Sequence, residues 1–356
     1  MTSDAARPTR SAQGSRGRFL ALWQAVWLIA VLAIIVAMPW IASAFWLGIL
    51  RSCAIAVIGA LALNILIGYT GQISLGHGGL MALGAFSAAY LTNTFDMPFV
   101  GVLIVASALG GIVGLIAGLP GVRLRGLYLA VTTLGVHFAV IAGATLYQSK
   151  VAMGTGFRIP SAALGPWQTG DGRVMYYVLM LFAAAVTVFT ANLLRSRVGR
   201  AWIAVRDRDL AAEAMGVHAA RTKVEAFVLT SALTALAGAL LAYNQRFVSV
   251  EAFSFSLTIQ YLAMVIIGGM ASIPGSILGA FFITLLPPAI EWLVGVIPTP
   301  DTVSTQLFYV QEGLFAVLLL VFLYVEPRGL VGLWPRLRAI PSRLRKRGRL
   351  PAPMHP

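Results

Sequence analysis

Long runs of apolar, uncharged residues recur along this 356-residue chain, and they constrain its fold more than any other feature. A run of eighteen or more such residues is long enough to cross a hydrocarbon core of about 30 Å as a helix. Only 11% of the residues are charged, against about 25% in a typical soluble domain. The short alternating segments of a membrane β-barrel are not visible. The chain is therefore predicted to be all-α, a polytopic transmembrane helical bundle.

The apolar runs predict about ten membrane spans with both termini on the same side. They lie near 19–45, 52–67, 78–94, 99–119, 126–147, 175–194, 226–245, 257–270, 275–296 and 308–325. With the N-terminus inside, the inner segments hold 4 Lys and Arg before the first span, 2 in the 120–125 loop, 7 in 195–224 and 8 after 325. The outer segments hold five, at Arg51, Lys150, Arg158, Arg173 and Arg246. Because positive residues favour the cytoplasmic side, we expect an N-in, C-in orientation.

The same pattern divides the chain into three parts. Residues 1–18 form a basic cytoplasmic tail, 19–325 the transmembrane domain with a cytoplasmic loop at 195–224, and 326–356 a second basic cytoplasmic tail. The net charge of +14 gathers in these tails and loops, so membrane lipid is the expected partner of the charge and nucleic acid is not. No small-residue cleavage site ends a short apolar core near the N-terminus, which predicts a retained first span rather than a signal peptide.

The stretch GYTGQISLGHGGLMALGAF, residues 68–86, interrupts this pattern with six glycines and several polar side chains. Irregular polar backbone at membrane depth is tolerated only where it is buried in protein or lines a watery cavity. In transporters, glycine-interrupted short spans point to the substrate path. We therefore expect a path or gate here, rather than a turn whose glycines only permit close packing. The short runs 52–67 and 257–270 are expected to be broken or re-entrant.

The candidate residues of the translocation path are polar side chains in and around this stretch and in the fifth span. They are Asn64, Tyr69, Thr70, Gln72, Ser74, His77, Thr132, Thr133 and His137. Two alternatives stay open. The threonine hydroxyls could simply bond to backbone carbonyls of their own helix, and a histidine such as His77 is more often a satisfied buried residue than a proton carrier.

Glycines spaced four residues apart indicate close helix packing elsewhere. Gly110, Gly114 and Gly118 form one such face, and Gly275 with Gly279 forms another. In lipid, small residues at this spacing let two helix backbones approach closely. These faces predict packing and identify no substrate.

Motifs for nucleotide binding and catalysis are missing from the sequence. No G-x-x-x-x-G-K-[ST] occurs, so the chain has no phosphate-binding loop of its own. The four histidines are scattered, without H-E-x-x-H or a Cys/His pairing, so no metal site is expected. No G-x-S-x-G nucleophile elbow is present either. We expect no catalytic residue and no cofactor, and a membrane-embedded enzyme or scaffold has no constellation to support it.

The loop 195–224 is longer than a simple connection requires. From Arg200 to Met215 it is rich in alanine and compatible with one helix, and Gly216 suits the C-terminal cap of that helix. Such a short helix predicts a docking element on the cytoplasmic face.

Taken together, the motifs resemble the permease subunits of branched-chain amino-acid ABC importers, in the LivM-like branch more than the LivH-like one. In chain order they are the stretch at 68–86, LRGLYLAVTTLG at 124–135, AAEAMGV in the cytoplasmic loop, VSVEAFSFSLTIQYLAMVIIGGMASIPGSILGAFF at 248–282 and VEPRGLVGLW at 325–334. The resemblance implies a multi-pass pore in the bacterial inner membrane. It implies as partners a second, LivH-like permease, two ATP-binding subunits and a periplasmic substrate-binding protein.

The resemblance also implies a role for the cytoplasmic loop and a range of substrates. A degenerate EAA…G coupling motif falls on Glu213, Ala214 and Gly216. With the charged residues before them, the candidate ATPase-coupling residues are Arg206, Asp207, Glu213, Ala214 and Gly216. Relatives commonly carry a TGG…GI-like stretch in the outer loop where this chain reads MGTGFRIPSA, residues 153–162. Branches of the family also serve urea, short amides and aromatic acids, so branched-chain amino acids or related small polar solutes are expected.

A pore without its own phosphate loop needs either an ATPase partner or an ion gradient. The alternative function is therefore a secondary transporter coupled to protons through His77, His137 or a glutamate. Neighbouring genes for P-loop proteins and a secreted binding protein would favour the ABC importer.

Overall fold

The computed structural model describes residues 33–124, 126–161, 163–164 and 167–296, together with 313, 316, 317, 320 and 330. It divides into two compact units, residues 1–48 and residues 49–356. Residues 33–41 of the first unit are helical. The two expected basic tails, 1–18 and 326–356, lie outside the described residues apart from Leu330.

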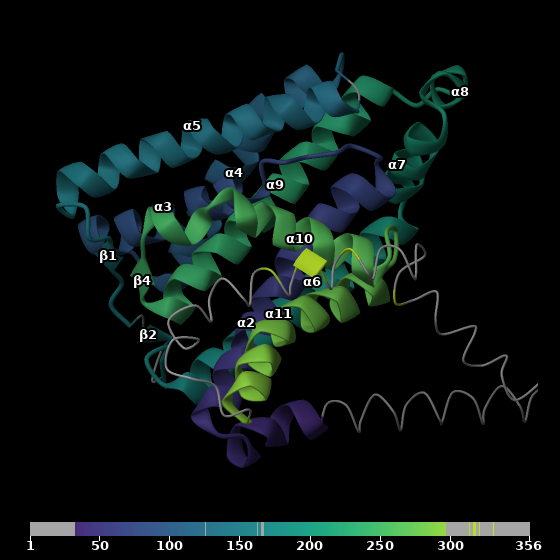
Figure 1. Ribbon diagram of the computed structural model, residues 1–356. Coiled ribbons are helices and arrows are strands. Elements are labelled where there is room, and N and C mark those ends of the chain that lie inside the picture. The colour runs from purple at the N-terminus through teal and green to yellow at the C-terminus, as the bar shows by residue number, and fades with distance from the viewer. Residues whose placement is uncertain are drawn as a thin grey trace, which may run out of the picture. The chain divides into compact units, whose positions relative to one another are not determined.

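The described chain is almost entirely helical, as the apolar runs predicted (Figure 1). Its longer helices are α2 (Ala44–Asn64), α3 (His77–Phe95), α4 (Phe99–Gly121), α5 (Leu127–Val151), α6 (Gly172–Arg195), α7 (Arg197–Asp207), α9 (Ala219–Gln245), α10 (Phe255–Gly268) and α11 (Ile273–Val296). The short ones are the π-helical turn η1 (Ile65–Tyr69), α8 (Asp209–Ala214) and the 3₁₀ turn η2 (Val250–Phe253). The strands β1 (Phe157–Arg158), β2 (Ala163–Leu164), β3 (Trp167–Gln168) and β4 (Phe247–Val248) have two residues each.

Six of the described helices are long and apolar enough to cross a membrane. They are Ala44–Tyr69, Phe99–Gly121, Leu127–Val151, Gly172–Arg195, Ala219–Gln245 and Ile273–Trp292. Two of the ten expected spans, 19–45 and 308–325, fall largely outside the described residues, so the count of ten and the N-in, C-in orientation remain predictions.

The two runs expected to be short behave differently. The run at 52–67 is part of a helix of 26 residues that already begins at Ala44, so the prediction of a short span there was wrong. Arg51 is accommodated within this helix, which extends the span beyond the uncharged run. The run at 257–270 is short as expected, since α10 has 14 residues and is followed directly by a turn into α11.

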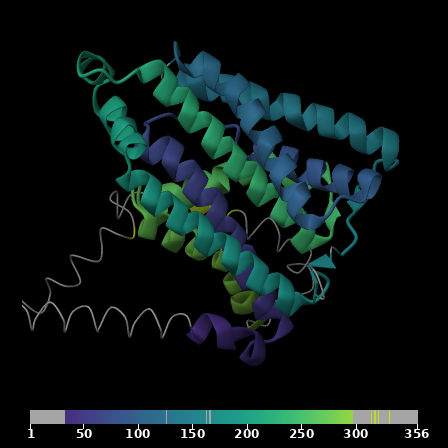
Figure 2. The ribbon, with the colours of Figure 1, turned by 180° about the vertical axis from the view of Figure 1, so that it is seen from behind.

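Helix α9 packs against both α3 and α4 and forms the centre of the second unit. Figure 2 shows it running between α4 and α5 on one side and α2 and α6 on the other. Glycines allow this approach, because a Cβ on Gly84 of α3 or on Gly110 of α4 would overlap atoms of α9. Gly114 and Gly118 also face α9, so the predicted glycine face of α4 is a packing surface.

The second unit has two distinct ends (Figure 1). Helices α7 and α8 lie at one end, which we call the coupling end. At the other end β1 pairs antiparallel with β4, with Phe157 opposite Val248, and β2 forms a hairpin with β3. The strand pair β1–β4 ties the loop after α5 to the loop after α9, which fixes where the chain turns back toward α10.

Candidate translocation path and coupling site

The chain leaves helical structure between Tyr69 and His77, where the glycine-rich stretch was expected to interrupt it. We call residues 70–76 the irregular segment. At its start the N–H groups of Thr70 and Gln72 still donate to carbonyl oxygens of η1. At its end side chains take over: Leu75 donates its N–H to Thr133 Oγ1 over 2.9 Å, and Gly76 donates to Ser74 Oγ over 3.3 Å. Non-helical backbone of this kind persists at membrane depth only where protein surrounds it.

The irregular segment leads into a place where two helices begin within the bundle. The N–H of Gly78, in the first turn of α3, donates to Thr258 Oγ1 in the first turn of α10 over 2.9 Å. A Cβ on Gly78 would lie 3.2 Å from the His137 ring and 3.4 Å from the Ser254 carbonyl oxygen. Two helix N-termini, each with a partial positive charge, therefore meet beside α5. This is the geometry of discontinuous helices at transporter sites.

His77 and His137 both lie at this meeting point and are buried. The His77 ring packs on Tyr261 of α10 with ring centres 4.6 Å apart, and its Nδ1 is 3.4 Å from Thr234 Oγ1 of α9. His77 Nε2 and His137 Nδ1 have no hydrogen-bond partner among the described residues. Buried side-chain nitrogens without a partner are unusual in folded proteins.

The two candidate threonines of α5, Thr132 and Thr133, differ in their contacts with the irregular segment. Thr133 is buried and accepts the Leu75 N–H, so it holds the irregular segment in place. Thr132 points elsewhere and donates its hydroxyl to the Tyr128 carbonyl oxygen of its own helix over 2.9 Å. Thr133 also donates to the Ala130 carbonyl oxygen over 2.9 Å, so both threonines make the local bond that the sequence left open, and only Thr133 is also brought to the segment.

Asn64 and Tyr69 lie on the other side of the break, in the last turns before it. Asn64 is buried and donates to Ser276 Oγ over 2.6 Å and to the Ser272 carbonyl oxygen over 3.0 Å. It therefore contacts the turn between α10 and α11 rather than the meeting point of α3 and α10. Tyr69 is half-buried at the last position of η1.

Thr70 and Gln72 face the coupling end of the unit. The Thr70 hydroxyl donates to the Leu66 carbonyl oxygen over 2.6 Å, and Gln72 Nε2 donates to Thr70 Oγ1 over 3.0 Å. Gln72 Nε2 also reaches the Lys223 carbonyl oxygen on α9 at 3.4 Å. The nine candidate path residues are consequently not one cluster. Ser74, His77, Thr133 and His137 gather within the bundle, whereas Thr70 and Gln72 lie closer to α7 and α8 at the coupling end.

The loop 195–224 forms two helices instead of the single helix expected over 200–215. Ser196 begins α7 by accepting the Val198 N–H, and the chain becomes extended at Arg208, with φ −156° and ψ 105°, before α8 begins. The prediction of one continuous helix was wrong, because alanine content favours a helix but does not specify where tertiary contacts bend it.

Gly216 ends α8 as predicted, with a left-handed φ of +86°. Its N–H donates to the Glu213 carbonyl oxygen, and the Val217 N–H donates to the Ala212 carbonyl oxygen, each over 3.0 Å. This pair of bonds is the Schellman arrangement of helix C-termini. Glu213 and Ala214 are exposed, as a docking surface requires.

Arg206 and Asp207 occupy the end of α7 and are also exposed. Arg206 does more than present charge: its Nη1 donates to the Gly68 carbonyl oxygen over 2.5 Å, and its side-chain stem lies against Gly71. A predicted coupling residue therefore contacts the start of the irregular segment directly.

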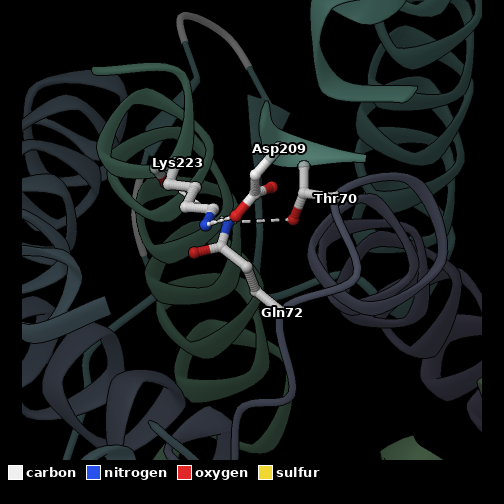
Figure 3. A network of polar contacts seen from close by, with 4 residues as sticks. All are labelled: Thr70, Gln72, Asp209 and Lys223. Atoms are coloured by element: carbon white, nitrogen blue, oxygen red, sulfur yellow. Dashed lines mark hydrogen bonds and ion pairs between the residues drawn. The ribbon is translucent and has the colours of Figure 1, made fainter. Parts of the chain in front are cut away.

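Asp209 and Lys223 are site residues that the sequence did not single out. Figure 3 shows them beside Thr70 and Gln72, with Lys223 Nζ 2.5 Å from Asp209 Oδ2. They border a cavity of about 290 Å³ at the coupling end, between the irregular segment, the start of α5 and the α7–α8 junction. In the sequence they are two of many charges in a basic loop, and the only available signal was a lysine three residues before the apolar run that begins at 226.

The family model described as branched-chain amino acid transport system / permease component matches residues 45–325. The chain is 32% identical to the high-affinity branched-chain amino acid transport system permease protein LivM of Escherichia coli (strain K12), over 74% of this chain and 67% of that protein.

Two more distant relatives are also permease proteins of branched-chain amino acid transport. The chain is 26% identical to the probable branched-chain amino acid transport permease protein LivM of Methanocaldococcus jannaschii, over 77% of this chain and 82% of that protein. It is also 26% identical to the permease protein LivH of Salmonella typhimurium, over 75% of this chain and 90% of that protein. No solved structure matches the chain. Since the family model covers most of its length, this multi-pass protein belongs to the permease-component family of branched-chain amino acid transport systems.

Proposed function

We propose that this chain is the permease subunit of an ABC importer that moves branched-chain amino acids, or related small polar solutes such as urea and amides, across the bacterial inner membrane. Its membership of the permease-component family supports this proposal. So do its relatives, which are named as branched-chain amino acid permeases of both the LivM and the LivH kind.

The observation that carries the proposal is the meeting of α3 and α10 beside His137. An amino acid crossing the membrane keeps a charged carboxylate, which helix N-termini and buried polar side chains can stabilise without a full opposite charge. Ser74, His77 and Thr133 are all buried, so a solute would reach them only after the chain around them moves. The irregular segment is therefore the gate that must move before a solute passes.

Energy for that movement comes from outside the chain. The sequence has no phosphate loop, so two ATP-binding subunits would bind nucleotide and act on the exposed side of α7 and α8, at Arg206, Asp207, Glu213, Ala214 and Gly216. A second, LivH-like permease would complete the pore. A periplasmic substrate-binding protein would deliver the solute at the end that carries β1–β4, and the coupling end would then face the cytoplasm.

Uptake into proteoliposomes that hold the whole complex tests the energy source. With ATP inside and binding protein outside, radiolabelled leucine should accumulate, and omission of the ATP-binding subunits should abolish accumulation. A proton gradient imposed without ATP should drive no uptake. Full uptake under a proton gradient alone would replace this proposal with the secondary transporter.

Competition identifies the solute class in the same vesicles. Unlabelled isoleucine and valine should inhibit leucine uptake, whereas urea, acetamide and phenylalanine should not. If urea or an amide inhibits leucine uptake and isoleucine and valine do not, the protein is still an ABC importer but its substrate class is different.

A further inference from the structure

Two sets of polar contacts connect helices α7 and α8 to the chain around the irregular segment, one directly and one through α9. From α7, Arg206 donates to the Gly68 carbonyl oxygen over 2.5 Å. From α8, Asp209 pairs with Lys223 of α9 over 2.5 Å, and the carbonyl oxygen of the same Lys223 accepts from Gln72 Nε2 at 3.4 Å. Figure 3 shows the second contact, with the side chains of Asp209, Lys223 and Gln72 directed toward one another. The junction between α7 and α8 is therefore linked by Arg206 to Gly68, just before the segment, and through Lys223 of α9 to Gln72 within it.

The Asp209–Lys223 ion pair is enclosed by protein. The two side chains are only 15% and 9% exposed. Removal of one partner from such a pair leaves an uncompensated buried charge, so separating the two residues is unfavourable. The other ion pair on α9, between Arg221 and Glu225, is 80% and 45% exposed, and a pair of that kind contributes little.

The enclosed pair borders free space. The cavity of about 290 Å³ is lined by Thr70, Gly71, Gln72, Arg206, Asp209 and Lys223 among others. Gln72 Oε1 is buried there and has no donor among the described residues. A buried acceptor without a donor is unfavourable, and the cavity leaves room beside this oxygen.

We propose that the Asp209–Lys223 ion pair is the joint through which α8 moves the irregular segment. Displacement of α8 by a closing ATPase pulls Asp209, and Lys223 carries the movement to Gln72, while Arg206 carries the same movement to Gly68. Asp209 and Lys223 are positioning residues, because they act through the segment and touch no solute. The inference rests on the proposed function, and it adds a specific link from α8 to the segment beside the direct contact of Arg206.

Variants of the assembled complex test the joint. Asp209→Asn and Lys223→Gln each break the pair, and each should lower the amount of leucine transported per ATP hydrolysed by about tenfold. Asp209→Glu retains the charge and should keep most of the transport. Arg221→Gln and Glu225→Gln are matched controls on the same helix and should change nothing. A merely structural pair would lower the yield or melting temperature of the complex but leave the transport ratio of the surviving complexes intact.

Thiol labelling then separates failure of the joint from failure of the proposed function. Ile73→Cys in a Cys53→Ala background places a thiol at an exposed position of the irregular segment, 41% exposed in the native side chain. Nucleotide should change its labelling rate by at least about threefold when the pair is intact, and Asp209→Asn should remove that response. No response with the pair intact would overturn ATP-driven gating itself. An equal response with and without Asp209 would overturn the joint alone.

Discussion

The side-chain amide of Asn64 donates to Ser276 Oγ over 2.6 Å and so joins the end of α2 to the first turn of α11. A second donor of the same amide reaches the Ser272 carbonyl oxygen, and its Oδ1 accepts the Ala271 N–H over 2.9 Å. Ala271 has a φ of +56°, which a residue with a Cβ rarely adopts. Asn64 therefore holds the tight turn that lets the short α10 reverse into α11.

Replacing this amide tests whether its hydrogen bonds stabilise the turn between α10 and α11. Asn64→Ala should lower the free energy of unfolding by about 1–3 kcal/mol, because it leaves buried groups of the turn unpaired. The thermal unfolding midpoint of the purified complex should fall, together with leucine uptake. Asn93→Ala is the control, because Asn93 makes one exposed bond to the Arg158 carbonyl oxygen. Equal unfolding midpoints for the two variants would show that the Asn64 contacts contribute nothing.

Glycine contacts at the centre of the bundle give a second prediction. Gly84→Ala should prevent α3 from packing on α9, since its Cβ would overlap the Ala235 carbonyl oxygen, a backbone atom that cannot turn away. Gly143→Ala on α5 meets nothing within 4 Å and should be tolerated. Monodisperse protein recovered after detergent extraction measures both. Normal recovery of Gly84→Ala would mean that the helices separate more easily than this packing implies.

The cap of α8 gives a third prediction. Gly216→Val forces a β-branched residue into φ +86°, at a cost of roughly 1–2 kcal/mol, although nothing lies within 4 Å of the new Cβ. The variant should insert and assemble normally but lose ligand-stimulated ATP hydrolysis, because the docking helix frays. Gly216→Asn should retain most of the activity, since asparagine tolerates the left-handed region. If valine and asparagine behave alike, backbone conformation at this cap is irrelevant to coupling.

Accessibility along the irregular segment gives a fourth prediction. Thr70, Gln72 and Ser74 are buried, whereas Ile73 between them is exposed. In a Cys53→Ala background, Ile73→Cys should react with a small water-soluble thiol reagent at rest. Thr70→Cys, Gln72→Cys and Ser74→Cys should react only while the complex turns over ATP and leucine. Rapid labelling of all four at rest would describe a surface turn, and persistent inertness of the three during turnover would describe a packed core.

Some of the fold and the site follows directly from the sequence. Apolar runs predict helices, because a backbone in lipid must satisfy its own hydrogen bonds, and the described runs are helical. The glycine-rich stretch predicts a break in the helices, which lies at residues 70–76. Gly216 predicts the end of α8, because the left-handed conformation of that cap is a local property of a residue without a Cβ.

Other features were decided by tertiary contacts alone. The chain bends at Arg208 within an alanine-rich run that favours one helix, and this bend brings Asp209 to Lys223, fourteen positions away on another helix. The separation of Thr132 from Thr133, and the use of Asn64 in the α10–α11 turn, likewise depend on which faces meet. Local sequence determines where a backbone is helical or broken, because those preferences act over a few residues. The partner of a buried polar group is chosen by the packing of distant helices, which no short stretch of sequence encodes.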